Sequence, residues 1–289
     1  MGQKKPSKAS PQISGMPDDR IAFQAIPHDF VGQYDGLGRW SILVGLRGSL
    51  AHGLYVSPDE PMGTDDLDVM AVCVPPADHY LGLSAFGSRG TQEIARGEWD
   101  IVIYELRKFI GLLLKGNPNV LAMLWLRPEH YLKLTRAGRE LITHRALFST
   151  KVAYKAFIGY AQAQLKGLDK SVFRGHMGAK RKELARHLGY DTKHAAHCVR
   201  LLRMGCEMME TGELRVDRSQ IDRDELLAIK RGEWSLSRIQ KEAAAGFDKA
   251  RIAYEKSPLP AAPDTATVNA LCVSIIRTAW RERGEWARE

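Results

Sequence analysis

Apolar positions in the first part of the chain fall in short runs that polar turns separate. Such runs predict strands at residues 40–47, 64–72 and 99–104. The segment 105–115 has the apolar period of a helix instead, and the Gly-Asn-Pro triplet at 116–118 ends it. This part of the chain is therefore expected to form a small sheet with helices beside it.

Beyond residue 135 nearly every segment has a helical pattern. The segments with helical spacing are 136–147, 150–167, 178–188, 192–211, 222–231, 236–256 and 266–283. We therefore expect a sheet-containing domain at 19–135 and a helical domain at 136–289, after a disordered tail at 1–18 that is rich in Lys, Ser, Pro and Gly. The predicted fold class is α+β, with a small mixed β-sheet core followed by an all-helical C-terminal region.

Two aspartates, Asp66 and Asp68, stand at alternate positions where the second predicted strand begins. Because strand side chains alternate between faces, both carboxylates would point the same way, while Leu67 and Val69 would point into the core. Two carboxylates on one face repel each other, so this pattern suggests a site for a divalent cation. Mg²⁺ fits such a site because it prefers oxygen ligands and usually takes only one or two carboxylates beside water and phosphate oxygens. Mn²⁺ is the alternative ion.

A third carboxylate is expected from the strand at 99–104. Asp100 is the first candidate, and Glu98, on the same predicted face, is the alternative. With Asp66 and Asp68, it would hold two ions roughly 3.5 to 4 Å apart, a spacing that clamps the attacking and leaving oxygens of an in-line displacement. These three carboxylates are the predicted metal ligands and catalytic residues.

A small-residue turn follows the first predicted strand, where Gly48 and Ser49 lead into a short helix. Backbone N–H groups at a helix start attract anions, and Gly48 lets a phosphate come close because it has no side chain. Ser49 would add a hydroxyl donor. Arg47 and His52 flank the turn and would contact a triphosphate or shape the turn. A Gly-Ser pair alone is an ordinary helix start, so the turn gains meaning only from the acidic strands that follow it.

A positive face marks the helix predicted at 192–211. Lys193, His197 and Arg200 fall at intervals of three or four residues and so share one side of this helix. In an enzyme that binds a nucleoside triphosphate, these side chains would neutralise the phosphates that the metal leaves exposed, with Lys193 the first choice. A solvated cationic face is the alternative interpretation.

In this order, the Gly-Ser turn, the Asp-x-Asp strand and the third acidic strand resemble the polymerase-β-like nucleotidyltransferases. More narrowly, the chain resembles the RNA-ligase-associated (RlaP-like) predicted nucleotidyltransferases from about residue 38 to 250, in the segments 48–53, 64–68, 100–109, 116–119 and 189–202. The resemblance implies a mixed sheet followed by helices, and transfer of a nucleoside monophosphate from an NTP such as ATP with release of pyrophosphate.

The resemblance also implies roles for individual residues. Asp66 and Asp68 match the metal-binding pair, Asp100 matches the third carboxylate, and Gly48 and Ser49 match the phosphate turn. Some relatives have Ser-Asp-x-Asp where this chain has Thr-Asp-Asp-Leu-Asp. That difference leaves Asp65 as an alternative ligand, although it would face away from Asp68 on a strand.

The formal net charge of +8 over 289 residues favours polyanionic partners. The densest group of basic residues consists of Arg174, His176, Lys180, Arg181, Lys182, Arg186 and His187. We predict that it binds RNA through phosphate contacts, which would make binding strongly salt-dependent. A solvated face is the alternative, because the group has no interleaved aromatic residues on which bases could stack.

The predicted function is metal-dependent transfer from an NTP to an acceptor hydroxyl, with an RNA end as the favoured acceptor. Nucleotidylation of a protein or a small molecule, and a non-catalytic module that binds NTP or RNA, are the alternatives. The four cysteines lack the spacing of a disulfide framework, no apolar run approaches membrane-spanning length, and no signal-peptide pattern opens the chain. We expect a cytoplasmic protein that does not contact a membrane. The sequence does not indicate which oligomeric state it has.

Overall fold

A five-stranded mixed sheet forms the first half of the molecule in this computed structural model, which describes residues 26, 28–57, 66–168 and 179–285. Its strands are β1 (Ser41–Leu46), β2 (Leu67–Cys73), β3 (Thr91–Arg96), β4 (Trp99–Glu105) and β5 (Tyr131–Leu134). They lie in the order β3-β4-β2-β1-β5. Only β2 and β4 run parallel among these neighbouring pairs. The predicted α+β fold class is confirmed.

The two faces of the sheet bury different residues of the same strands. In β2, Val69 packs into one core cluster, whereas Met70 and Val72 pack into the other. Leu67 packs against the same cluster as Val69, as the alternation of strand side chains predicts. Asp68 therefore faces the side on which Met70 and Val72 lie.

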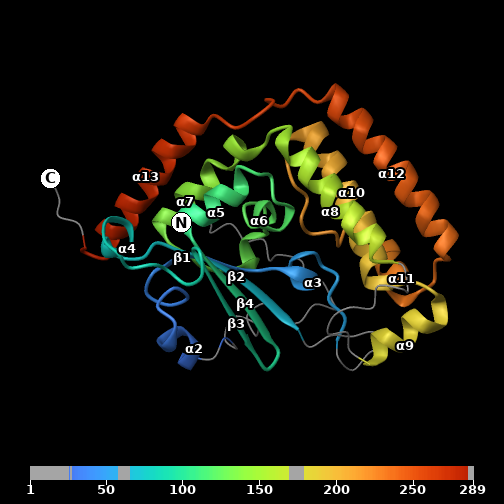
Figure 1. Ribbon diagram of the computed structural model, residues 1–289, viewed down its shortest axis with the longest axis horizontal. Helices are drawn as coiled ribbons and strands as arrows, with labels where there is room; N and C mark the ends of the chain where they lie inside the picture. The colour runs from blue at the N-terminus through green and yellow to red at the C-terminus, as the bar shows by residue number, and fades with distance from the viewer. Residues whose placement is uncertain (1–25, 27, 58–65, 169–178, 286–289) are drawn as a thin grey trace, which may run out of the picture.

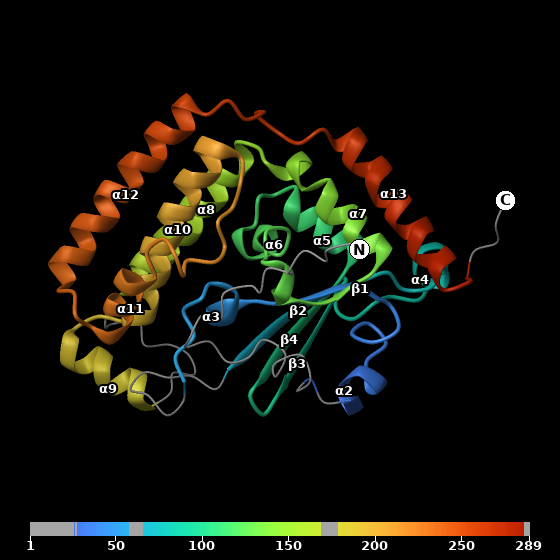
Figure 2. The ribbon, with the colours of Figure 1, turned by 180° about the vertical axis from the view of Figure 1, so that it is seen from behind.

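Helices cover the Met70 face. Near the sheet are α5 (Leu106–Leu113), α6 (Pro118–Ala122), α7 (Arg136–Thr143) and α13 (Thr265–Glu282), and they appear on one side of it in Figure 1 and Figure 2. The indole N–H of Trp280 in α13 donates to the carbonyl of Pro75 at 2.8 Å, which ties the last helix to the segment after β2. The core on this face includes residues on both sides of position 135. The division into two domains stays a prediction.

Helix α10 (Thr192–Thr211) is the centre of the helical half. It packs against α8 (Val152–Lys166), α11 (Arg223–Arg231) and α12 (Leu236–Lys256), while α9 (Ala179–Leu188) lies beside α11 in both ribbon views. The carboxylate of Asp191 caps α10 by accepting from two backbone N–H groups. An extended segment with three prolines joins α12 to α13 along the outer rim of the molecule (Figure 1).

The remaining described helices are short. They are α2 (His28–Gln33), α3 (Gly48–Ala51), α4 (Asp78–Leu81), η1 (Pro128–His130) and η2 (Arg145–Phe148). The helices expected beyond residue 135 are present, but strands β3 and β5 were not predicted. Most side chains of β3 are polar and solvent-accessible, and β5 has only four residues, too few to show a period. Within the described ranges, no helix is both long and apolar enough to cross a membrane.

Candidate active site

Asp68 and Asp100 are partners in the parallel register of β2 and β4. Parallel partners share a face of the sheet, so the two carboxylates lie side by side. Asp66 is exposed and directly precedes β2. Burial raises the pKa of Asp68, and the negative charges of Asp100 and Asp66 raise it further. The structure therefore brings Asp66 and Asp100 within electrostatic reach of Asp68, while their roles as ligands stay predictions.

Glu98, the alternative third carboxylate, does not lie on a strand. It occupies the turn between β3 and β4, and β4 begins one residue later. Gly97 has a positive φ of 61° and makes this tight hairpin turn possible. Glu98 therefore lies one residue outside β4, and its role as the alternative third carboxylate stays a prediction.

Arg47 contacts both strand carboxylates. Its Nη2 atom lies 2.8 Å from Oδ2 of Asp100 and 3.4 Å from Oδ1 of Asp68. The positive charge of Arg47 opposes the burial that raises the pKa of Asp68. The backbone N–H of Arg47 also donates to the carbonyl of Asp68 at 2.9 Å. Contact between Arg47 and a triphosphate stays a prediction.

The Gly-Ser turn lies against Asp68. Gly48 begins α3 with a positive φ of 63°, a conformation that favours glycine. A Cβ atom at this position would collide with Oδ2 of Asp68. The half-buried Ser49 follows it, and its carbonyl accepts from the N–H of Leu54 at 2.8 Å. The structure thus places the predicted phosphate turn directly beside a predicted metal ligand.

His52 links this turn to the helical half. Its Nδ1 atom lies 2.9 Å from the carbonyl of Val216, and its Nε2 atom contacts the guanidinium of the buried Arg200. Because a guanidinium only donates, Nε2 must accept, so Nδ1 carries the proton and donates to Val216. Burial, and next the charge of Arg200, hold the pKa of His52 well below its usual value. Direct contact of His52 or Arg200 with a nucleotide stays a prediction.

Lysines from two helices lie near the same turn. Lys193 in α10 is exposed, and its charge lowers the pKa of Asp68. Lys230 in α11 donates to the carbonyl of Leu54 at 3.1 Å. Burial, followed by the charges of Lys193 and Arg200, lowers the pKa of Lys230 to about 8. Lys230 was not among the residues predicted from the sequence, because no helical spacing relates a residue of α11 to a residue of α10.

Positive charge also surrounds His197. This side chain is largely buried, and burial lowers its pKa well below the usual value. The charges that lower it further are those of Arg200, Lys193, His194 and Lys230. The positive charges of Lys193, Arg200 and Lys230 therefore lie close together around His197, beside the turn. Such a group suits an anionic ligand.

The carboxylates fit a magnesium or manganese ion chemically, although they form no complete cage. Within the described part of the chain, no three His, Cys, Asp or Glu side chains are grouped closely enough to hold a metal ion. Asp68 and Asp100 supply oxygen donors from adjacent strands. Mg²⁺ usually binds through one or two carboxylates together with substrate phosphates and water, so this pair meets its requirement.

The predicted RNA-binding group is only partly described. Arg174 and His176 lie outside the described residues, and Lys180 and Arg181 are placed in α9 by their backbone alone. Lys182, Arg186 and His187 are exposed on α9. RNA contact by this helix stays a prediction.

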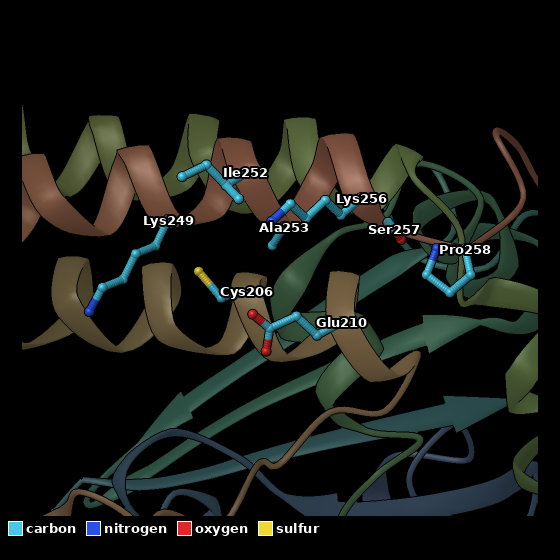
Figure 3. A pocket seen from close by; sticks show the side chains of 8 residues that line it. All are labelled: Cys206, Glu210, Lys249, Ile252, Ala253, Lys256, Ser257 and Pro258. Carbon is cyan, nitrogen blue, oxygen red and sulfur yellow. The ribbon is translucent and has the colours of Figure 1, made fainter.

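A surface groove lies apart from these residues, between α10 and α12. It has a volume of about 440 Å³, and Cys206 and Glu210 line it from α10 while Lys249 lines it from α12 (Figure 3). None of the predicted site residues lines this groove. It is therefore not part of the candidate active site.

A mixed sheet that carries a glycine turn and paired aspartates is the arrangement implied by the resemblance to polymerase-β-like nucleotidyltransferases. Residues 42–274 match the family model described as the RNA repair pathway DNA polymerase beta family, RlaP. The match covers most of the chain, and the protein belongs to this family. No curated protein matches the chain.

Proposed function

We propose that the protein transfers a nucleoside monophosphate from an NTP to an acceptor hydroxyl and releases pyrophosphate. The observation that carries this proposal is the pairing of Asp68 with Asp100 on adjacent strands, with Gly48 packed against Asp68. Membership of a polymerase-β-like family supports the same chemistry. The reaction forms one P–O bond to the acceptor and breaks the bond between the α-phosphorus and its bridging oxygen.

The residues of the chain take separate parts in this reaction. Asp68 and Asp100 would hold divalent cations, with Asp66 as a further ligand, and the exposed Asp100 would accept the proton of the acceptor hydroxyl. Bound Mg²⁺ or Mn²⁺ would neutralise phosphate charge and favour deprotonation of the attacking oxygen. Backbone N–H groups of the Gly48–Ser49 turn orient the triphosphate, and Lys193 and Lys230 neutralise its terminal phosphates.

The proposed acceptor is the hydroxyl end of an RNA. The family description, which names an RNA repair pathway, supports this choice. Lys182 and Arg186 stand four residues apart on α9, both exposed, and so present two positive charges on one side of a helix. The net charge of +8 favours association with a polyanion.

The test is to incubate the full chain with each ribonucleoside triphosphate and either Mg²⁺ or Mn²⁺, and to measure pyrophosphate release. RNA with a free 3′-hydroxyl, RNA with a blocked 3′ end and no RNA are compared. Pyrophosphate that depends on the free hydroxyl, together with label transferred to the RNA, is the expected result. Equal pyrophosphate release with and without RNA would contradict the assignment of RNA as the acceptor. No pyrophosphate release with any triphosphate would contradict the transferase activity.

A further inference from the structure

The Arg47 guanidinium contacts both carboxylates of the Asp68–Asp100 pair. It contacts Oδ2 of Asp100 at 2.8 Å and Oδ1 of Asp68 at 3.4 Å through a single nitrogen. These atoms belong to the two carboxylates that the proposed function assigns to cation binding. A divalent cation bound by both carboxylates would lie beside the guanidinium, and the two positive charges would repel each other. The two cannot both remain there at low energy.

The guanidinium is incompletely satisfied in this position. Nε of Arg47 is buried and has no hydrogen-bond partner among the described residues. Most buried polar side-chain atoms in proteins have a hydrogen-bond partner, so the unpaired Nε atom needs a structural explanation. An arginine that occupies this position in only one of two states provides that explanation.

The backbone of Arg47 is held independently of its side chain. Its N–H donates to the Asp68 carbonyl at 2.9 Å, and its carbonyl accepts from the N–H of Ala51 at 3.5 Å. The side chain is 27% exposed, so it borders solvent. The guanidinium can therefore leave the carboxylates by side-chain rotation while the turn at Gly48 stays in place.

We propose that Arg47 is the resident counter-ion of the Asp68–Asp100 pair, and that a divalent cation binds this pair by displacing the Arg47 guanidinium. In the cation-free protein the arginine offsets the repulsion between two adjacent carboxylates. Cation binding then breaks the ion pairs of Arg47 with Asp68 and with Asp100. A cation that arrives with a triphosphate meets this cost more easily, because the phosphates add ligands and attract the freed guanidinium. The proposal rests on the proposed function only in taking these two carboxylates as the cation-binding pair.

The test measures Mn²⁺ binding to the full chain without nucleotide, by the paramagnetic resonance signal of free Mn²⁺. Arg47→Gln removes the competing charge, so its dissociation constant should fall about fivefold, equivalent to about 1 kcal/mol. Arg47→Met, which keeps the aliphatic stem, serves as a second variant and should change the constant in the same direction. Asp68→Asn should abolish the tight binding in both backgrounds, which assigns the signal to this site.

The matched control is Arg39→Gln. Arg39 pairs with Asp35 on the surface at 3.5 Å, so this variant removes the same charge from an ion pair elsewhere. It should leave the dissociation constant of Mn²⁺ unchanged. A constant for the Arg47 variants that equals or exceeds that of the wild type overturns the proposal.

Thermal unfolding gives a second readout that does not require turnover. In the presence of a chelator, Arg47→Gln should melt below the wild type, because its carboxylates repel each other without a counter-ion. Added Mn²⁺ should raise the Tm of the variant more than that of the wild type. Equal Mn²⁺-dependent shifts contradict the proposal. Tight Mn²⁺ binding by the variants without any pyrophosphate release by the wild type would instead contradict the proposed function.

Discussion

The carboxylate of Asp68 occupies the space that a side chain on Gly48 would need, and Gly48 has a φ of 63°. Gly48→Ala should therefore displace the carboxylate and also place alanine in the left-handed region, at a cost of about 1 to 2 kcal/mol of stability. If Asp68 is a metal ligand, as proposed, we expect transfer activity to fall at least about tenfold, because a misplacement of about 1 Å slows catalysis strongly. Steady-state pyrophosphate release and urea unfolding measure the two effects.

Gly97 provides the control for this substitution. It has a nearly equal φ of 61°, but a Cβ atom there would meet no atom within 4 Å. Gly97→Ala should lose similar stability and keep its activity. Equal activity losses in both variants would show that backbone strain alone, and not the contact with Asp68, explains the result.

Lys230 should make NTP use depend on pH. Its pKa is lowered to about 8, so it loses its positive charge as the pH rises through that value. If Lys230 binds the triphosphate, kcat/KM for NTP should fall between about pH 7 and 9, since this ratio reports ionisations of the free enzyme. Lys230→Arg should keep its charge and flatten this fall, whereas Lys230→Met should have a low kcat/KM throughout. An unchanged profile in both variants would exclude Lys230 from NTP binding.

His52 should make the free energy of unfolding depend on pH in the acidic range. Its pKa is well below 6.5 in the folded protein. Below that pH the unfolded chain binds more protons than the folded one, so stability falls as the pH falls, by up to about 1.4 kcal/mol per pH unit for one histidine. His52→Gln should reduce this slope, because glutamine does not titrate. Urea unfolding between about pH 5 and 8 measures it.

The exposed His144 gives the control for that experiment. His144→Gln should leave the slope of stability against pH as it is in the wild type. A slope that His52→Gln does not change would mean that burial and the charge of Arg200 do not lower the pKa of His52 in the folded protein.

The sequence predicted those parts of the candidate site that a short stretch of chain contains. The spacing of Asp66 and Asp68, and the Gly48 turn after an apolar run, are local patterns. The local pattern did not show that Glu98 belongs to a turn, because the hairpin turn that begins at Gly97 ends directly before the apolar run that marks β4.

Contacts between distant segments could not be predicted from pattern. His52 meets Val216 and Arg200, which are 164 and 148 residues away along the chain. Arg47 meets Asp100 only because β2 and β4 pair in one particular register. Hydrophobic spacing indicates which residues are buried, but it does not specify which buried elements become neighbours.

RNA binding by α9 should depend on salt and on two exposed side chains. Lys182→Glu combined with Arg186→Glu should weaken binding and flatten the dependence of log affinity on log salt, by about 0.7 for each single-strand phosphate that the helix no longer neutralises. Transfer to a minimal hydroxyl acceptor should survive. Fluorescence anisotropy with a labelled single-stranded RNA measures the affinity and its salt dependence.

The control for charge reversal lies on α12. Lys241→Glu combined with Lys249→Glu makes the same change of net charge at exposed positions of another helix. Its salt slope should match that of the wild type. Equal weakening by both double variants would indicate that net charge, and not α9, determines RNA binding.

Pyrophosphate release by Asp68→Asn and Asp100→Asn, compared with Glu98→Gln, tests the central claim most directly. The two asparagine variants keep the shape of the side chains and remove the charges that would hold a cation. We expect each to lose at least about a hundredfold in kcat, a loss comparable to removing one essential transition-state contact. Glu98 lies in the turn directly before β4, so Glu98→Gln should retain wild-type turnover. Wild-type turnover by either asparagine variant would contradict the assignment of the active site to this carboxylate pair.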